Sequence, residues 1–167
     1  MSQDKKADPT FLIIDAQSVK NASPAQQKGY DAGKKVSGIK RHIGVDTLGL
    51  PHAVHITTAN VSDKAGAKEM MQQSHQDLRN ILKVLVDGGY NGQPFADFIK
   101  ELLDAEVEVA KRSEWHTFAV IPKRWIVERT FAWLERCRRL WKNCERSLKS
   151  YTAMMQLACI SLCLRRL

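Results

Sequence analysis

Apolar and polar positions along the chain follow two different periods, which together predict an α/β fold. Runs with strand character occupy residues 11–14, 41–46, 52–58, 83–86 and 106–110. Helical spacing of apolar residues is found at 63–78, 93–103, 123–140 and 148–167, the first behind a suitable N-cap residue, Ser62. Three strands followed by alternating helices and strands favour a mixed five-stranded sheet flanked by helices on both faces.

Two polar segments interrupt this pattern. Residues 1–9 are typical of a short disordered lead-in, so one domain is expected over residues 10–167. Residues 21–38 are rich in Gly, Ser, Lys and Gln and predict a mobile basic loop.

No run approaches the roughly 18 apolar residues that cross a bilayer, and the N-terminus lacks the apolar core of a signal peptide. We therefore expect a cytoplasmic protein with no membrane contact.

The charge balance favours a polyanionic partner. The chain carries 26 Lys+Arg against 18 Asp+Glu, a formal net charge of +8 and a pI near 9.5. Between Lys123 and Lys149, nine basic residues face three glutamates. Three tryptophans are interleaved with them, and core or partner-helix contacts are a better expectation for these rings than stacking on bases.

Three acidic residues occupy positions that suit metal-dependent phosphoryl transfer. Asp15 and Asp87 each end an apolar strand-like run, and Glu128 lies in the helical segment 123–140. Carboxylates just past buried strands are held at the end of a sheet, where substrate can reach them. Mg²⁺ prefers oxygen ligands and usually takes only one or two carboxylates besides substrate phosphates. Three carboxylates can therefore hold a pair of ions.

The helical segment has an apolar stripe and a charged stripe. The apolar stripe, expected to pack on the sheet with Cys137 at its edge, contains Val127, Phe131, Leu134 and Trp141. The adjoining stripe contains Arg124, Glu128, Glu135, Arg139 and Lys142. Glu128 at the border could point at the strand ends, while basic neighbours point at phosphates. A solvated face with pairs such as Glu135 with Arg139 is the alternative.

Other polar residues favour structural roles. Asp46 precedes a predicted turn, where Asp is favoured for its local hydrogen bonds, and Asp63 would complement a helix dipole. The hairpin histidines lack the spacing of a helix metal motif, and we expect His42, His52 and His55 to be satisfied within the sheet. Reduced thiols that pack as small hydrophobes are expected at Cys137, Cys144, Cys159 and Cys163.

Four segments in this order resemble a known family. The segments IIDAQSVK, KRHIGVDTLG, VDGGYNG and RWIVERTFAWLERCRRL are similar to the catalytic domain of bacterial insertion-sequence DDE transposases, in the IS-five-like branch of the IS-four superfamily. The resemblance runs from about residue 10 to the end and implies a ribonuclease H-like fold, which the element order also favours. It implies that Asp15, Asp87 and Glu128 are the catalytic metal ligands, and it places the family's helix arginine at Arg124.

The resemblance also implies an activity and its partners. Two Mg²⁺ or Mn²⁺ ions would support hydrolysis at the transposon ends and then attack of the freed 3′-hydroxyl on target DNA. We expect a homo-oligomer in the active complex. The candidate DNA-binding residues are Lys20, Arg124, Arg129, Arg138, Arg139 and Lys142.

The chain departs from the family pattern at three points. Ile121 stands where the superfamily has Tyr, and Glu135 stands where it has a phosphate-binding Lys, which Arg139 or Lys142 could replace. Only fourteen residues precede Asp15, so the chain resembles the second half of a transposase: a separately started reading frame, a frameshift partner or a truncated copy. An upstream frame could supply an N-terminal DNA-binding half as a partner. Two alternatives stay open: a nuclease of the same fold, and a truncated product that represses transposition.

Overall fold

The computed structural model describes residues 8–110 and 123–166. In this part of the chain the strands are β1 (Phe11–Lys20), β2 (Gly29–Asp31), β3 (Val36–Val45), β4 (Pro51–Thr58), β5 (Lys83–Val86) and β6 (Glu106–Val109). The helices are α1 (Asp63–Ser74), the short 3₁₀ helix η1 (Gly88–Tyr90), α2 (Gln93–Leu103), α3 (Arg124–Glu135) and α4 (Leu148–Leu164). The expected lead-in, residues 1–9, falls almost wholly outside the described residues, as does Ile121.

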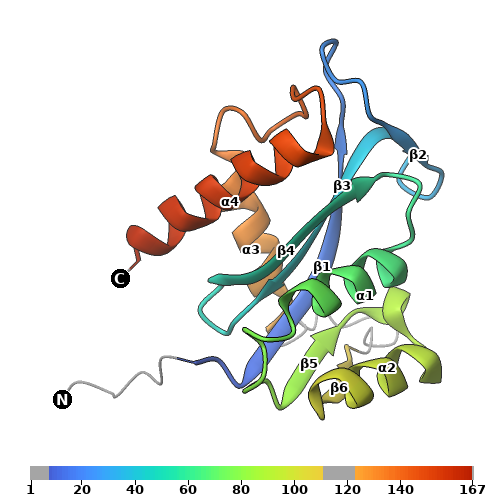
Figure 1. Cartoon of the computed structure of the whole chain (residues 1–167), viewed down its shortest axis with the longest axis vertical. Helices are drawn as coiled ribbons and strands as arrows, with labels where there is room; N and C mark the ends of the chain where they lie inside the picture. The colour runs from blue at the N-terminus through green and yellow to red at the C-terminus, as the bar shows by residue number, and fades with distance from the viewer. Residues whose placement is uncertain (1–7, 111–122, 167) are drawn as a thin grey trace, which may run out of the picture.

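One mixed sheet organises the described residues. Its order is β2-β3-β1-β5-β6, with β4 also paired to β3. β1 runs antiparallel to β3 and parallel to β5, which in turn runs parallel to β6. Helices α3 and α4 lie on one side of the sheet, and α1 and α2 lie on the other (Figure 1). The mixed sheet and its two helical layers are confirmed, and the described part adds a sixth strand, β2, to the five expected.

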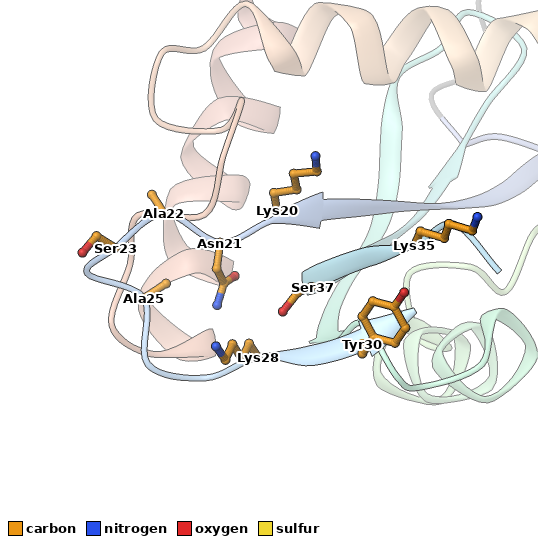
Figure 2. A pocket seen from close by; sticks show the side chains of 9 residues that line it. All are labelled: Lys20, Asn21, Ala22, Ser23, Ala25, Lys28, Tyr30, Lys35 and Ser37. Carbon is orange, nitrogen blue, oxygen red and sulfur yellow. The ribbon is translucent and has the colours of Figure 1, made fainter. Parts of the chain in front are cut away.

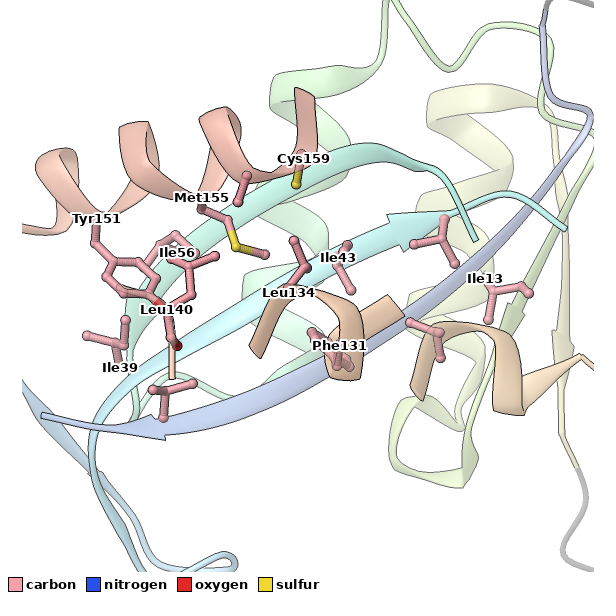
Figure 3. Packing of buried hydrophobic residues seen from close by; sticks show 14 of the residues in the cluster. Ile13, Ile39, Ile43, Ile56, Phe131, Leu134, Leu140, Tyr151, Met155 and Cys159 are labelled. Carbon is pink, nitrogen blue, oxygen red and sulfur yellow. The ribbon is translucent and has the colours of Figure 1, made fainter. Parts of the chain in front are cut away.

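Two apolar cores lie on the two faces of the sheet, because successive strand residues point to opposite sides. Ile13 packs with Phe131 and Leu134 of α3 in the core beneath α3 and α4 (Figure 3). Its neighbours Leu12 and Ile14 belong to the other core, with α1 and α2. Since Asp15 is two residues after Ile13, β1 directs it to the side of α3.

Helix α3 is shorter than the helical pattern predicted. It ends at Glu135, and tight turns follow in which Leu134 accepts from the amide of Cys137 and Cys137 from that of Leu140. The turns bring Asn143 to the end of β1, where its amide donates to the carbonyl of Lys20. Backbone pairing with the strand therefore outweighs the helical periodicity. The predicted stripe is correct as far as Leu134 and wrong for Trp141, whose exposed fraction is 59%.

The segment 21–38 is more ordered than expected. It contains β2 and the start of β3, and its first part is tied to the chain before α4. The Ala22 amide donates to the Asn143 carbonyl, and the Gln27 side chain accepts from the Leu148 amide. The prediction of a mobile loop is therefore wrong, because partners more than a hundred residues away fix this segment.

Several local predictions are confirmed. Ser62 caps α1 by accepting from the amide of Ala65, and Asp46 accepts from two turn amides and contacts His52. The expectation for His42 is confirmed only in part: its Nε2 pairs with Thr57, but its buried Nδ1 has no hydrogen-bond partner among the described residues, and burial lowers the pKa of the imidazole to about 3. The cysteines are free, as expected, but only Cys159 is buried. Within the described residues, no helix combines the length and apolar character that a membrane span requires.

Candidate active site

Asp15 and Asp87 stand side by side on two neighbouring parallel strands. The register pairs Ile13 of β1 with Leu85 of β5, and each aspartate follows its paired residue by two positions. Asp87 comes directly after β5 and caps η1, where its Oδ1 accepts from the amide of Gly89 at 2.8 Å. One oxygen of Asp87 is thus used to hold its own turn, and the other is free to face the neighbouring helix.

Asp15 is held inside a strand, which differs from the expectation that the strand ends at Ile14. β1 continues to Lys20 because its second half pairs antiparallel with β3, where Asp15 lies opposite Ile43. The polar sequence after Asp15 hides this pairing, since β3 pairs with the backbone along the edge of β1 and requires no apolar side chains there. A mid-strand position makes the carboxylate more rigid than a position at a strand end.

Arg124 links the second aspartate to the glutamate. Its Nη2 lies 3.6 Å from Oδ2 of Asp87, and its Nε lies 3.6 Å from Oε1 of Glu128, one helical turn later. Both distances are those of ion pairs and exceed hydrogen-bond length. Arg124 therefore brings Glu128 toward the aspartates, although the Glu128 side chain is still 59% exposed.

The carboxyl group of Asp15 is poorly compensated. Burial, opposed by the Ala16 amide and reinforced by the nearby charge of Asp87, raises its pKa to about 6. Arg124 counteracts the shift only in part. A carboxylate that is buried next to a second carboxylate is stabilised in its charged form by a cation.

The carboxylate oxygens match the ligands that hard divalent cations prefer. The cavity between Asp15, Asp87 and Arg124 measures about 10 Å³, close to the space of one water molecule. In residues 8–110 and 123–166, no three acidic, His or Cys side chains already converge as a metal-binding group. The two aspartates lie together, whereas Glu128 is paired with Arg124.

The remaining predicted DNA-binding residues are scattered. Arg129 is held between the rings of Trp125 and Trp133 and donates to the carbonyl of Leu48, so its guanidinium already has partners. Lys20 lies exposed at the end of β1, about five residues from Asp15.

Beyond the end of α3, the basic residues do not continue the face of Glu128. Arg139 is paired with Glu145 and not with Glu135, the partner in the alternative of a solvated helix face, and Lys142 lies over the ring of Trp141. Arg138 is exposed. The expectation that Arg139 or Lys142 shares the helix face of Glu128 is therefore wrong, because α3 ends before them.

A polar chain next to the aspartates was not predicted. Gln17 follows Asp15 by two residues and thus lies on the same face of β1. Its amide nitrogen donates to Glu135 at 2.6 Å, and its oxygen accepts from Arg41 at 3.0 Å. Arg41 is fully buried and also donates to the hydroxyl of Tyr151. The two-residue spacing from Asp15 was a usable signal for Gln17, whereas only the fold brings Glu135 and Arg41 together.

Comparison with known proteins identifies the family. Residues 6–164 match the family described as Transposase DDE domain. Over 136 residues the chain is 32% identical to a protein assigned as the transposase of insertion sequence element IS402 from Burkholderia cepacia, covering 75% of this chain and 63% of that protein. It is 28% identical to the corresponding protein of element IS6501 from Brucella ovis, covering 75% of this chain and 98% of that protein. The chain thus spans less than two thirds of the first of these relatives.

Solved structures agree on the fold. The catalytic core domain of BIV integrase superposes with a TM-score of 0.56 at 13% identity, covering 92% of this chain and 82% of that one. A chain from a simian T-cell lymphotropic virus intasome, in complex with the PP2A regulatory subunit B56 gamma, gives a TM-score of 0.59 at 16% identity, covering 93% and 49%. The fold is ribonuclease H-like, as integrase catalytic cores are, and with the match over residues 6–164 the chain belongs to the transposase DDE domain family.

Proposed function

We propose that the chain is the catalytic domain of an insertion-sequence transposase that cuts DNA at the ends of its element and joins the freed 3′-hydroxyl to target DNA. The observation that supports this most strongly is the alignment of Asp15 and Asp87 on paired parallel strands, with Glu128 linked to them through Arg124. The motifs further favour the IS-five-like branch of the IS-four superfamily.

The three acids are proposed as the ligands of two Mg²⁺ or Mn²⁺ ions. Asp15 and the Oδ2 atom of Asp87 face the same small cavity, and the raised pKa of Asp15 reflects charge that a cation would offset. When bound, a pair of divalent ions supplies activation of the attacking oxygen and stabilisation of the leaving one. Mg²⁺ needs only one or two carboxylates besides substrate oxygens, so the two aligned aspartates suffice to begin the site.

The side chains of the protein then act by position and charge. The strand backbone and the cap of η1 fix Asp15 and Asp87, so neither carboxylate must be ordered when DNA arrives. Glu128 rotates from Arg124 toward the aspartates. Arg124, released from both acids, is then placed to pair with a phosphate oxygen of the DNA, for which a guanidinium is well suited.

The proposed partners are the transposon ends and the target DNA. The basic composition and the exposed Lys20, Arg138 and Arg139 support contacts with the phosphate backbone. A homo-oligomer in the active complex and an N-terminal DNA-binding half are parts of the same proposal, because both DNA ends must be held during joining.

The test is a cleavage and joining assay on a plasmid that carries the inverted repeats flanking the coding sequence. We expect Mg²⁺-dependent nicks at the repeats followed by joined products, and loss of both with Asp15→Asn, Asp87→Asn or Glu128→Gln. The control Asp77→Asn changes an exposed aspartate outside the site. Cutting without joining would indicate a nuclease, and binding without cutting would indicate a repressor.

A further inference from the structure

A basic hollow lies at the C-terminal end of β1. It measures about 490 Å³ and is lined by Lys20, Asn21, Ala22, Ser23, Ala25, Lys28, Tyr30, Lys35 and Ser37. Figure 2 shows the lysines arranged around it, from the end of β1, the segment before β2 and the residue before β3. The Tyr30 ring is 57% exposed at its rim. The hollow therefore presents ammonium groups, hydroxyls and an aromatic ring.

The positive charge of this hollow is not neutralised by the described residues around it. None of the residues that line it is acidic. Asp31, the acidic residue of β2, pairs with the buried ammonium of Lys40 at 3.2 Å and accepts from the hydroxyl of Ser18. These partners and the amide of Lys34 lower the pKa of Asp31 to about 2 against the opposing effect of its burial. Lys40 is shared with Asp63, whose Oδ1 lies 2.8 Å from the same ammonium, so Asp31 is engaged in an ionic cluster outside the lining of the hollow.

The walls of the hollow are fixed in advance. Asn21 accepts from the side chain of Asn143 and donates to the carbonyl of Gln27. The Gln27 side chain caps the start of α4 by accepting from Leu148. A preformed surface binds with a smaller loss of conformational entropy than a loop that must be ordered.

The hollow and the aspartates are connected along β1. Lys20 follows Asp15 by five residues in the same strand, which corresponds to about 16 Å at the usual rise. Between them, the ammonium of Lys34 donates to the carbonyl of Ala16 at 3.0 Å, and it contributes to the electrostatics of Asp15. Because this spacing is odd and β1 keeps a continuous register with β3, the side chains of Asp15 and Lys20 point to opposite faces of the sheet.

We propose that this hollow binds the DNA backbone outside the phosphate that is cut, through Lys20, Lys28 and Lys35. The inference rests on the proposed function for the identity of the DNA. Ammonium groups without acidic partners attract a polyanion, and phosphate contacts release counterions on binding.

The first test measures how DNA affinity depends on salt, in the absence of divalent metal. A triple variant, Lys20→Gln, Lys28→Gln and Lys35→Gln, is compared with wild type on a duplex of about 20 base pairs. The matched control is Lys68→Gln, Lys83→Gln and Lys100→Gln, which removes the same charge from lysines that contact Phe98, Glu108 and Asp104. Thermal melting confirms that both variants are folded.

We expect the slope of log affinity against log salt to fall by about two to three units in the hollow variant and by less than about one in the control. The corresponding Lys→Arg triple variant keeps the charge and should keep the slope. Equal slopes in the hollow variant and wild type, or an equal fall in the control, would overturn the proposal. Because no metal or cleavage is needed, this result is independent of whether the protein cuts DNA.

The second test locates the contact on the DNA. A single uncharged methylphosphonate replaces one backbone phosphate at a time, at successive positions on both sides of the cut. Wild type should lose affinity at the positions that the hollow contacts, and the hollow variant should bind all of these duplexes equally. Displacement of DNA by inorganic phosphate at constant ionic strength would instead identify a site for small anions and overturn the proposal.

Discussion

Arg124 and Glu128, one turn apart on α3, are paired at 3.6 Å between Nε and Oε1. The same guanidinium reaches Asp87 at 3.6 Å. Arg124 thus occupies the position between two acids where a divalent cation is proposed to bind. Metal binding and the pairing of Arg124 must compete, because both stabilise the same negative charge.

This competition predicts opposite effects of removing the arginine. Arg124→Ala should bind Mn²⁺ several-fold more tightly than wild type, as measured by calorimetry, because its acids have no internal cation. The same variant should cleave DNA about a hundredfold more slowly, because the phosphate loses a charged donor. The cleavage rate of Arg124→Lys should lie between those of wild type and Arg124→Ala. Weaker metal binding in Arg124→Ala would show that the arginine organises the acids for the ions.

Asp15→Asn should stabilise the metal-free protein while removing its activity. The folded pKa of Asp15, about 6, lies above the ordinary aspartate value of 3.8 because the carboxylate is buried. Below pH 3.8 the Asp15 carboxyl is protonated in both the folded and the unfolded protein, so its burial costs no stability. As the pH rises through the window between the two values, the wild type loses up to about 3 kcal/mol that the Asn variant keeps.

Urea unfolding at a series of pH values checks this. The difference in unfolding free energy between Asp15→Asn and wild type should be small near the acidic end of the window and reach about 1 to 3 kcal/mol above it. Asp77→Asn, at an exposed position, should show no such pH-dependent gain. A difference independent of pH would mean that the Asp15 charge carries little strain.

The sequence pattern was sufficient for the sheet and for the placement of Asp15 and Asp87 on neighbouring strands, but not for their surroundings. Asp15 and Asp87 were readable because each follows an apolar strand-like run. The length of β1 could not be predicted, since pairing with β3 extends the strand through polar residues. Likewise, the periodicity after Glu135 remains helical in the sequence, whereas Asn143 pairs with the end of β1. Such errors arise where distant backbone groups compete with local propensity.

Gly66→Ala should destabilise the protein although it lies in a helix. A Cβ at Gly66 would come within 2.1 Å of Cε1 of the buried His42 ring. The helix-propensity gain of about 1 kcal/mol is smaller than the expected cost of overpacking, about 1 to 3 kcal/mol. In a His42→Ala background the ring is gone, so Gly66→Ala should become neutral or stabilising. Urea unfolding of the four proteins measures this coupling.

Glu135→Lys should increase the contribution of phosphate contacts. Glu135 is exposed, lies at the end of α3 and is bound to Gln17 on the strand of Asp15. A lysine there should raise the salt slope of DNA binding by about one unit. Glu101→Lys, an equal charge change on α2 across the sheet, serves as the control. An equal rise in both variants would indicate only a general effect of net charge.

A change of metal preference tests the central claim, that the aligned aspartates hold the catalytic ions. In Asp87→Cys a thiolate replaces a carboxylate. The thiolate is a poor ligand for Mg²⁺ and a better ligand for the softer Mn²⁺. Asp97→Cys on α2 is the control. Cleavage by Asp87→Cys should fall more than about a hundredfold in Mg²⁺ and recover in part in Mn²⁺, while the control matches wild type in both. An unchanged metal preference in Asp87→Cys would contradict the account.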